Sequence, residues 1–245
     1  MPTLCLVVPC YNEAARLDAD AFLRWLDASP GCSVCFVDDG SVDGTRARLE
    51  AVALLRPAQV HVRALPANGG KAEAVRQGLL AMAAQQRWSV LGYWDADLST
   101  ALDQVVPIHA ALVAQPDAVL AIGSRQRRAG ARIDRRWSRH VAGRAFAAAV
   151  RALLGIDLYD TQCGAKLVRA EAVTTLCDAP FLTRWIFDVE LLVRLRQRDA
   201  ASMRARVIEV PLAAWRDVAG SKLRAADMLQ APRELWAIRQ AYRRG

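Results

Sequence analysis

With 245 residues, 53% of them hydrophobic, the chain can bury a substantial core, and we expect a single α/β domain. No window approaches the roughly 18 uninterrupted apolar residues of a membrane span, and residues 1–8 lack the basic segment and cleavage site of a signal peptide, so we expect neither feature. The six cysteines include Cys32-x-x-Cys35, which has no second pair or histidine cluster to complete a zinc site. We therefore expect buried thiols in a reducing compartment.

The positive charge is concentrated in one part of the chain. Residues 124–151 contain nine arginines and one aspartate, so this window carries the whole net charge of +8. Such a window indicates an anionic partner, which can be a phosphorylated substrate, an anionic membrane surface or nucleic acid. A nucleic-acid-binding module would interleave aromatic side chains for stacking, and the window offers only Trp137 and Phe146. We therefore expect no nucleic-acid partner.

The first half of the chain alternates predicted strands with predicted helices. Strands are expected at residues 4–8, 33–37, 59–65, 88–93 and 118–122. Helices are expected from Glu13 to about residue 28, from an Asp43 cap to about residue 55, from Lys71 to about residue 86, and over 102–114. This succession predicts a mainly parallel, Rossmann-like sheet, with the loops that follow the strands along one edge.

The second half is less regular. Helices are expected at about 136–154 and at 187–198, with a strand at 205–210 between the latter and a final helical segment, 224–244. That segment either closes the core or lies on a membrane surface with Trp236 and Tyr242 among four arginines, and we favour the core.

Two carboxylates lie just after the predicted strand 88–93. Asp95 and Asp97 would repel one another at the carboxyl end of the strand unless a cation lies between them. Mg²⁺ or Mn²⁺ takes carboxylate and phosphate oxygens, so we expect Asp95 and Asp97 to hold such an ion. Ser99 either adds a third oxygen or caps the following helix.

Several motifs together resemble the inverting family 2 glycosyltransferases of the GT-A fold. They are VPCYNE at 8–13, VDDGSVDGT at 37–45, Asn68-x-Gly70-Lys71 and Asp95-Ala96-Asp97. The segments DTQCGAKL at 160–167, RWIFDVE at 184–190 and GSKL at 220–223 are similar to the polyprenyl-phosphate glycosyltransferases, especially the dolichyl-phosphate β-glucosyltransferases. The resemblance implies one GT-A domain over 1–245, with a nucleotide-sugar half at 1–123 and an acceptor half at 124–245.

The resemblance implies a nucleotide-sugar donor, with UDP-glucose as the expected one. Tyr11 offers a flat face for the base, and Glu13 and Asp38 can accept hydrogen bonds from uracil or ribose, although Glu13 also suits the first turn of a helix. Gly69 and Gly70 would let the backbone approach phosphate at a helix start, beside the charge of Lys71. The full set of expected donor-binding residues is Pro9, Tyr11, Glu13, Asp38, Asp39, Gly40, Gly70, Lys71, Asp95, Ala96 and Asp97. Asp39 suits a turn as well as it suits donor binding. Gly40 is expected to adopt a backbone conformation that a side chain would forbid.

The expected acceptor is a polyprenyl phosphate, met at an anionic membrane surface. A phosphomonoester, with a second pKa near ~6, is already a nucleophile at neutral pH, so the enzyme needs cations more than a general base. We expect Arg125, Arg136, Ser138, Arg139, Gln162, Lys166 and Lys222 to contact the acceptor phosphate, with Arg135 a further candidate. Asp97, Arg125 and Asp188 are the expected catalytic residues.

Two alternatives stay open at this point. A related transferase could use GDP-mannose or act on a soluble hydroxyl acceptor, because base specificity depends on a few loop contacts.

The expected location is cytoplasmic and peripheral, at the inner face of the membrane.

Overall fold

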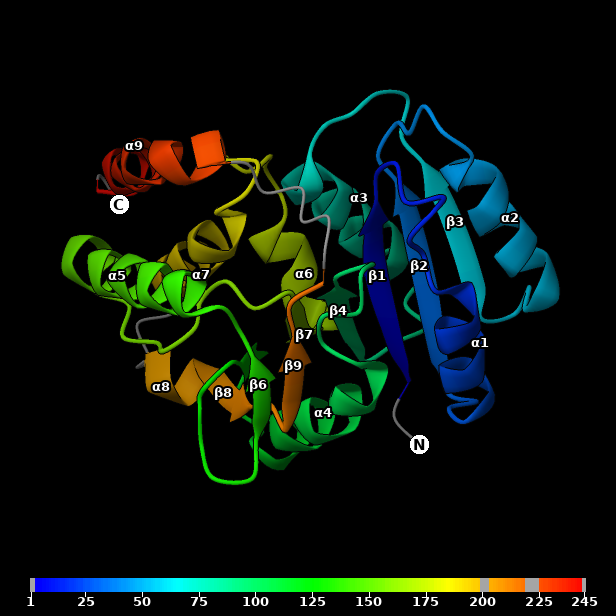
Figure 1. Ribbon diagram of the computed structural model, residues 1–245, viewed down its shortest axis with the longest axis horizontal. Helices are drawn as coiled ribbons and strands as arrows, with labels where there is room; N and C mark the ends of the chain where they lie inside the picture. Colours follow the sequence, from blue (N-terminus) through cyan, green and yellow to red (C-terminus); the bar gives the residue numbers. More distant parts are fainter. Residues whose placement is uncertain (1–2, 199–202, 219–224, 244–245) are drawn as a thin grey trace.

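A computed structural model describes residues 3–198, 203–218 and 225–243. Its centre is a seven-stranded sheet with the strand order β3-β2-β1-β4-β7-β5-β8 (Figure 1). The strands are β1 Leu4–Cys10, β2 Cys32–Asp38, β3 Val60–Ala64, β4 Val90–Trp94, β5 Leu120–Ser124, β7 Ala165–Arg169 and β8 Val207–Pro211. A separate pair joins β6 Arg132–Asp134 to β9 Ala214–Arg216 in parallel. The mainly parallel sheet predicted from the sequence is confirmed.

One strand of the large sheet was not predicted. β7 lies between β4 and β5 and runs antiparallel to both, whereas every other pairing in the sheet is parallel. Its sequence, Ala-Lys-Leu-Val-Arg, has Lys166 as its second residue and Arg169 as its last, and these charged residues interrupt the apolar run that marks a strand buried on both faces. β7 belongs to the acceptor half of the sequence, so the sheet draws strands from both predicted halves. The functional division at residue 123 stays a prediction.

The predicted helices are present, and two further short helices, Ala170–Leu176 and Met203–Arg206, were not predicted. They are α1 Ala19–Asp27, α2 Thr45–Leu55, α3 Lys71–Ala83, α4 Val105–Ala114, α5 Trp137–Leu154, α6 Ala170–Leu176, α7 Phe187–Arg198, α8 Met203–Arg206 and α9 Ala225–Ala241, with a short 3₁₀ helix, η1, at Leu102–Gln104. The start predicted for α1 is wrong, because the helix begins six residues after Glu13, where the Asp18 carboxylate accepts a hydrogen bond from Ala21 N at 3.0 Å. The Asp43 carboxylate does accept the first-turn N–H of Thr45 at 2.9 Å, as predicted.

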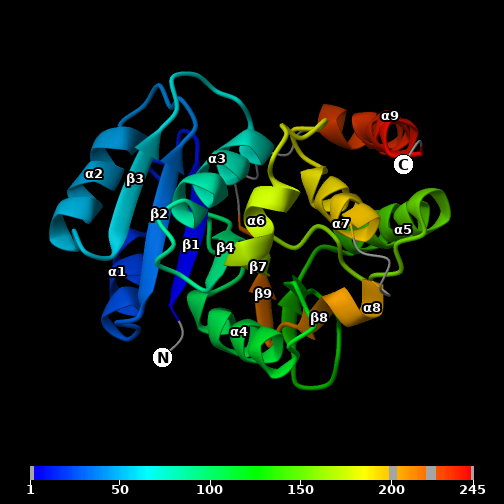
Figure 2. The ribbon, with the colours of Figure 1, turned by 180° about the vertical axis from the view of Figure 1, so that it is seen from behind.

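Helices cover the sheet and close the core. α3 packs on β1, β2 and β4, and α6 lies beside α3; both are turned toward the viewer in Figure 2. β1 and β2 are almost wholly buried, and the thiols of Cys5 and Cys35 are fully buried, which confirms that they are core residues. The predicted strands were recognisable because a parallel strand covered on both faces is a continuous apolar run.

The C-terminal helix belongs to the core. Leu235 and Ile238 are buried, and Tyr242 donates a hydrogen bond to Glu190 Oε1 of α7 at 2.8 Å. α9 lies beside α5 at the far end of the molecule from β3 (Figures 1 and 2). The side chain of Trp236 is 48% exposed. Within residues 3–198, 203–218 and 225–243, no helix combines the length and apolar character needed to cross a membrane.

Candidate active site

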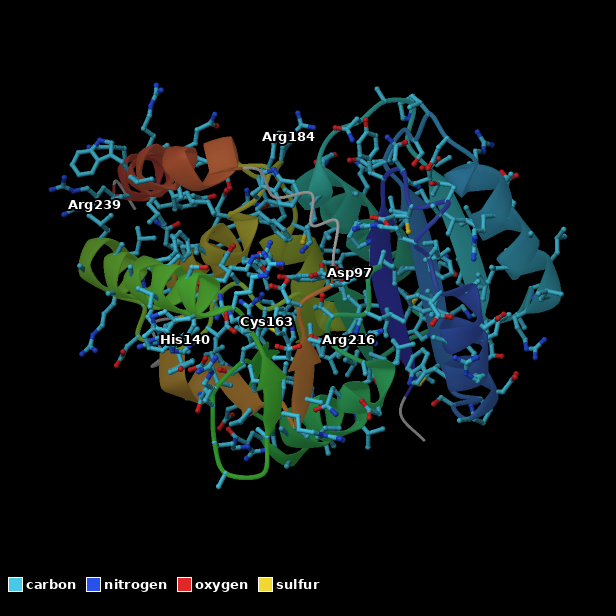
Figure 3. All side chains as sticks on the ribbon, viewed as in Figure 1. Asp97, His140, Cys163, Arg184, Arg216 and Arg239 are labelled. Carbon is cyan, nitrogen blue, oxygen red and sulfur yellow. The ribbon has the colours of Figure 1, made fainter. Side chains whose placement is uncertain are left out.

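The Asp95–Asp97 loop follows β4 in the middle of the molecule (Figure 3). Lys71, the first residue of α3, places Nζ 2.6 Å from Asp95 Oδ1. Asp97 Oδ1 accepts a hydrogen bond from Ser99 N at 3.0 Å. The helix-cap role expected for Ser99 is wrong, since the residue that caps η1 is Ala101. The loop thus brings two carboxylates and one ammonium group together at the carboxyl end of a central strand.

A glycine makes room for the Asp95 carboxylate. Asp95 N donates to Gly164 O at 3.0 Å, across from β4 to the start of β7. A Cβ placed on Gly164 would lie 1.8 Å from Asp95 Oδ2, which is far inside van der Waals contact. No other residue type fits this position without moving Asp95. The role of Gly164 was missed, although its signal was present in the DTQCGAKL segment.

The charges of this loop are not balanced. Burial by itself lowers the pKa of Lys71, but Asp95, Asp188 and Asp97 outweigh it and raise that pKa above its ordinary value. Burial, followed by the charge of Asp95, raises the pKa of Asp97. One lysine therefore does not neutralise the loop, and the site attracts a further cation.

The Asp95–Asp97 loop is the candidate metal site. Among the residues that the structure describes, no group of three or more histidine, cysteine, aspartate or glutamate side chains is arranged to hold a metal ion. Asp95 and Asp97 provide two carboxylates, the chemistry that Mg²⁺ and Mn²⁺ prefer. The residues present fit an ion that takes its remaining ligands from substrate phosphate and water, as Mg²⁺ often does.

The loop before α3 is held by Asp39. Its Oδ1 accepts from Gly69 N at 2.7 Å and its Oδ2 accepts from Gly70 N at 2.8 Å. These two N–H groups donate to Asp39 in this structure, and the predicted approach of the Gly69 and Gly70 backbone to phosphate stays a prediction. Gly70 has φ +92°, and a Cβ there would lie 2.6 Å from Arg184 Nε, so glycine is needed for Arg184 to pack over the loop.

The predicted nucleotide residues meet at the ends of β1 and β2, where Cys10 pairs with Asp38. Asp38 Oδ1 accepts from Ser41 N at 3.1 Å, and Glu13 forms a bidentate pair with Arg16 at 2.8 and 3.0 Å. Glu13 precedes α1 by six residues, so the first-turn alternative is wrong. Pro9 lies within β1, which ends at Cys10, and the half-buried Tyr11 follows the strand directly. Their contacts with a base stay predictions.

Gly40 has the special conformation expected of it. Its φ is +65°, and a Cβ would lie 2.6 Å from the backbone of Ala67 and Asn68. A side chain is therefore excluded both by conformation and by the neighbouring loop. This confirms the predicted reason for glycine at this position, and it keeps the loop after β2 against the loop before α3.

A buried ion pair lies beneath the loop. Lys166 is fully buried, and its Nζ lies 2.5 Å from Asp188 Oδ1 and 2.6 Å from Cys163 O. Tyr93 of β4 donates its hydroxyl to the same Asp188 oxygen. Burial, together with the charge of Asp188, raises the pKa of Tyr93 well above its ordinary value. Lys166 and Asp188 therefore support β4 and the segment that contains Gly164, and their predicted contacts with substrate stay predictions.

On the acceptor side, Arg125 is held by Asp160. The pair is bidentate, with Nε 2.6 Å from Oδ2 and Nη2 2.7 Å from Oδ1. Burial by itself raises the pKa of Asp160, but Arg125 outweighs it and lowers that pKa to about 2. Glu209 of β8 accepts from Asp160 N at 2.9 Å and so holds the segment in place. Asp160 was missed as a site residue, although it begins the DTQCGAKL segment.

Positive charge accumulates around Arg125. Burial, followed by the charge of Arg125, lowers the pKa of Arg135, while the charge of Asp160, the partner of Arg125, acts in the opposite direction. An anion bound there would relieve the repulsion between Arg125 and Arg135. Arg139 instead pairs with Asp217, with Nη1 2.5 Å from Oδ1.

The remaining expected acceptor residues occupy different environments. Arg136 and Ser138 are exposed at the start of α5, and Gln162 has a buried Nε2 that has no hydrogen-bond partner among the described residues. Lys222 lies outside the described residues.

The geometry agrees with comparisons to known proteins. Residues 5–176 match the model described as glycosyl transferase family 2. The chain belongs to this family. It is a glycosyltransferase, and its sheet and helices have the GT-A arrangement of solved glycosyltransferases.

Among relatives of this family 2 glycosyltransferase, a dolichyl-phosphate beta-glucosyltransferase of Trichomonas vaginalis is 30% identical, with 98% of this chain and 71% of the relative covered. The mouse (Mus musculus) dolichyl-phosphate beta-glucosyltransferase is 32% identical over 99% of this chain and 76% of the relative. A polyprenol monophosphomannose synthase of Mycolicibacterium smegmatis is 30% identical over 96% of this chain and 86% of the relative.

Solved structures share the fold of this glycosyltransferase. The glucosyl-3-phosphoglycerate synthase of Mycobacterium tuberculosis in complex with UDP has a TM-score of 0.69 at 21% identity, covering 98% of this chain and 80% of that one. The same synthase with Mn²⁺ and UDP-glucose has a TM-score of 0.67 at 19% identity, covering 98% and 79%. At this identity the likeness establishes the GT-A fold alone.

Proposed function

We propose that this glycosyltransferase moves glucose from UDP-glucose to a polyprenyl phosphate, with inversion at the anomeric carbon. The observation that supports it most is that dolichyl-phosphate beta-glucosyltransferases match this chain over nearly its whole length at about 30% identity. The site agrees with two anionic substrates, because Lys71 lies at the donor loop while Arg125 and Arg135 form a separate positive region.

The donor diphosphate would bind between the start of α3 and the Asp95–Asp97 loop. The Lys71 ammonium group is part-exposed there and offers a compact positive charge at a helix N-terminus, where anions are favoured. Mg²⁺ or Mn²⁺ held by Asp95 and Asp97 supplies the positive charge that neutralises the leaving diphosphate. Gly164 and the buried Lys166–Asp188 pair keep Asp95 in the position that both functions require.

The acceptor phosphate would be held by Arg125 and Arg135. Its oxygen attacks the anomeric carbon of glucose as the bond from that carbon to UDP breaks, so the α-linked donor yields a β-linked polyprenyl-phosphate glucose. No general base is needed, because a phosphomonoester is ionised at neutral pH. Electrostatic stabilisation by fixed cations contributes the largest part of such accelerations.

The same proposal places the enzyme at an anionic membrane surface on the cytoplasmic side. Trp137 is 70% exposed at the start of α5, next to exposed Arg136 and within the arginine-rich window. Aromatic side chains among arginines suit the boundary between lipid headgroups and acyl chains. Sedimentation with phosphatidylglycerol vesicles tests this part, and equal sedimentation with neutral vesicles in high salt would contradict it.

Calorimetry with UDP, GDP, UDP-glucose and GDP-mannose, each with Mn²⁺ and with a chelator, tests the donor. Metal-dependent binding of the uridine ligands alone supports the proposal, and transfer to undecaprenyl phosphate with a β product by NMR completes it. Asp97→Ala should keep the fold, as judged by melting temperature, and lose at least about 100-fold in activity. A fully active, metal-independent Asp97→Ala enzyme would exclude the metal role.

A second candidate is transfer of mannose from GDP-mannose to the same acceptor. It is favoured by the match to a polyprenol monophosphomannose synthase, which covers 96% of this chain. Preferential binding of GDP in the same calorimetric series would select it.

A further inference from the structure

A large groove opens beside the active site. It lies between α1, residues 98–106 and the paired strands β6 and β9, and its volume is about 940 Å³. This volume is at the upper end of pockets that enclose a drug-sized ligand, roughly 300–1,000 Å³. None of the donor residues or phosphate-binding arginines described above lines it, so neither substrate's charged group explains it.

The floor of the groove is apolar and its rim is charged. Leu98, Leu102 and Trp215 are buried, and Trp25 is half-buried beside them. The charged lining residues are all exposed; they are Asp18, Arg24, Asp103, Arg132, Asp134 and Arg216. A sugar or a nucleotide requires convergent polar groups on the floor of its site, whereas a hydrocarbon chain requires an apolar floor with the charges in water.

Residues that line the groove are neighbours of both substrate sites. Leu98 and Ser99 follow Asp97 directly, and Ser99 O accepts a hydrogen bond from Arg216 N at 3.0 Å. The ring of Trp215 lies 5.3 Å from the Arg125 guanidinium carbon. Figure 3 labels both Asp97 and Arg216 in the middle of the molecule. A molecule whose phosphate is held at Arg125 could therefore pass its next atoms along Trp215 into the groove.

The backbone at Leu98 supports this arrangement. Leu98 has φ +51°, a conformation that branched apolar residues rarely adopt and that tends to occur at functional sites. In this conformation one short loop keeps the Asp97 carboxylate at the active site and the Leu98 side chain in the groove. The donor site and the groove are thus built by consecutive residues.

We propose that the groove binds the isoprenoid chain of the acceptor, starting at the phosphate end. This inference rests on the proposed polyprenyl-phosphate acceptor and assigns its hydrocarbon part to Leu98, Leu102, Val106, Trp25 and Trp215. It explains why an enzyme that transfers sugar to a phosphate has an apolar groove next to its acceptor arginines. A polyprenyl phosphate would then be recognised by its chain as well as by its phosphate.

Two valines of α4 make a matched test. Val106 lines the groove and is 66% exposed, while Val113 lies two turns further along the helix, outside the groove, and is 53% exposed. Val106→Asp should lower kcat/KM for undecaprenyl phosphate at least about tenfold, because the chain would have to desolvate a carboxylate. With dimethylallyl phosphate, which has a single isoprene unit, Val106→Asp should stay within about twofold of wild type, and Val113→Asp should do so with both acceptors.

The outcomes separate this inference from the proposed function. If the wild-type enzyme transfers sugar to neither prenyl phosphate, the proposed function is wrong. If undecaprenyl phosphate is a substrate and Val106→Asp uses it as well as Val113→Asp does, the groove does not hold the chain. Equal losses with both acceptors and a changed oligomeric state in light scattering would instead identify the groove as a protein interface.

A second measurement does not depend on the turnover of a short acceptor. A polyprenyl phosphate with a diazirine on its second isoprene unit should label residues 98–106 or 214–216 on irradiation, as mapped by mass spectrometry. Excess undecaprenyl phosphate should suppress this labelling. Labelling confined to α5 or α9 would place the chain elsewhere and overturn the proposal.

Discussion

Replacing Gly164 with alanine should disable the active site while leaving the fold in place. The new Cβ would lie 1.8 Å from Asp95 Oδ2, whereas an ordinary contact begins near 3.4 Å, so the carboxylate has to move by about 1.6 Å. The movement would also break the ion pair between Lys71 Nζ and Asp95 Oδ1, which lie 2.6 Å apart. A misplacement of about 1 Å can cost about 100-fold in rate, so we expect kcat/KM to fall by at least about 100-fold, or about 2.7 kcal/mol.

The assay is transfer of labelled glucose to undecaprenyl phosphate, together with thermal melting of each variant. Crowding at one site should cost about 1–3 kcal/mol of stability, so the variant should still fold. Gly44→Ala is the matched control, because a Cβ there meets only Ala14 Cβ at 3.8 Å, and it should stay within about twofold of wild type. A folded Gly164→Ala enzyme with wild-type activity would refute the reasoning that Asp95 must occupy its present position.

Three further predictions concern the charged residues. Arg135→Gln should raise KM for the acceptor about tenfold, because it removes one of the two cations that hold the acceptor phosphate. Calorimetry should show unchanged binding of UDP-glucose. Weaker binding of UDP-glucose would instead place Arg135 at the donor site. The folded-state pKa of Asp160 is about 2 against an ordinary 3.8, so this carboxylate stabilises the fold by about 2 kcal/mol above pH ~4, and the contribution is lost as the pH falls toward 2. Urea unfolding at pH 7, 5 and 3 should therefore show a smaller loss of stability on acidification for Asp160→Asn than for wild type, and equal losses would contradict the lowered pKa. Lys166→Met should lower the free energy of unfolding by about 3–5 kcal/mol, because it leaves Asp188 buried without its cation. The double variant Lys166→Met with Asp188→Leu should regain part of this stability. A double variant that is less stable than the single one in melting experiments would show that the charges themselves are needed.

The alternation of strands and helices was readable from the sequence because parallel strands covered on both faces are continuous apolar runs. The loops that follow β1, β2 and β4 contain the carboxylates and glycines of the family motifs, and parallel strands bring their carboxyl ends to one edge. The glycosyltransferase fold and the region of the donor site followed from these local patterns. The backbone conformation of Gly40 could likewise be predicted from the sequence, since it depends on the local turn.

Only the tertiary structure decided which side chains support the site from beneath. Lys166 interrupts an apolar pattern, and its burial depends on Asp188, which is 22 residues away in α7. Gly164 matters because the antiparallel β7 places it against Asp95, 69 positions earlier in the sequence, and the Asp160–Arg125 pair likewise joins separate segments. The groove has walls from α1, residues 98–106 and β6–β9, so none of these segments reveals it alone. Sequence patterns report how a segment is buried, whereas pairing between distant segments depends on how the sheet orders its strands.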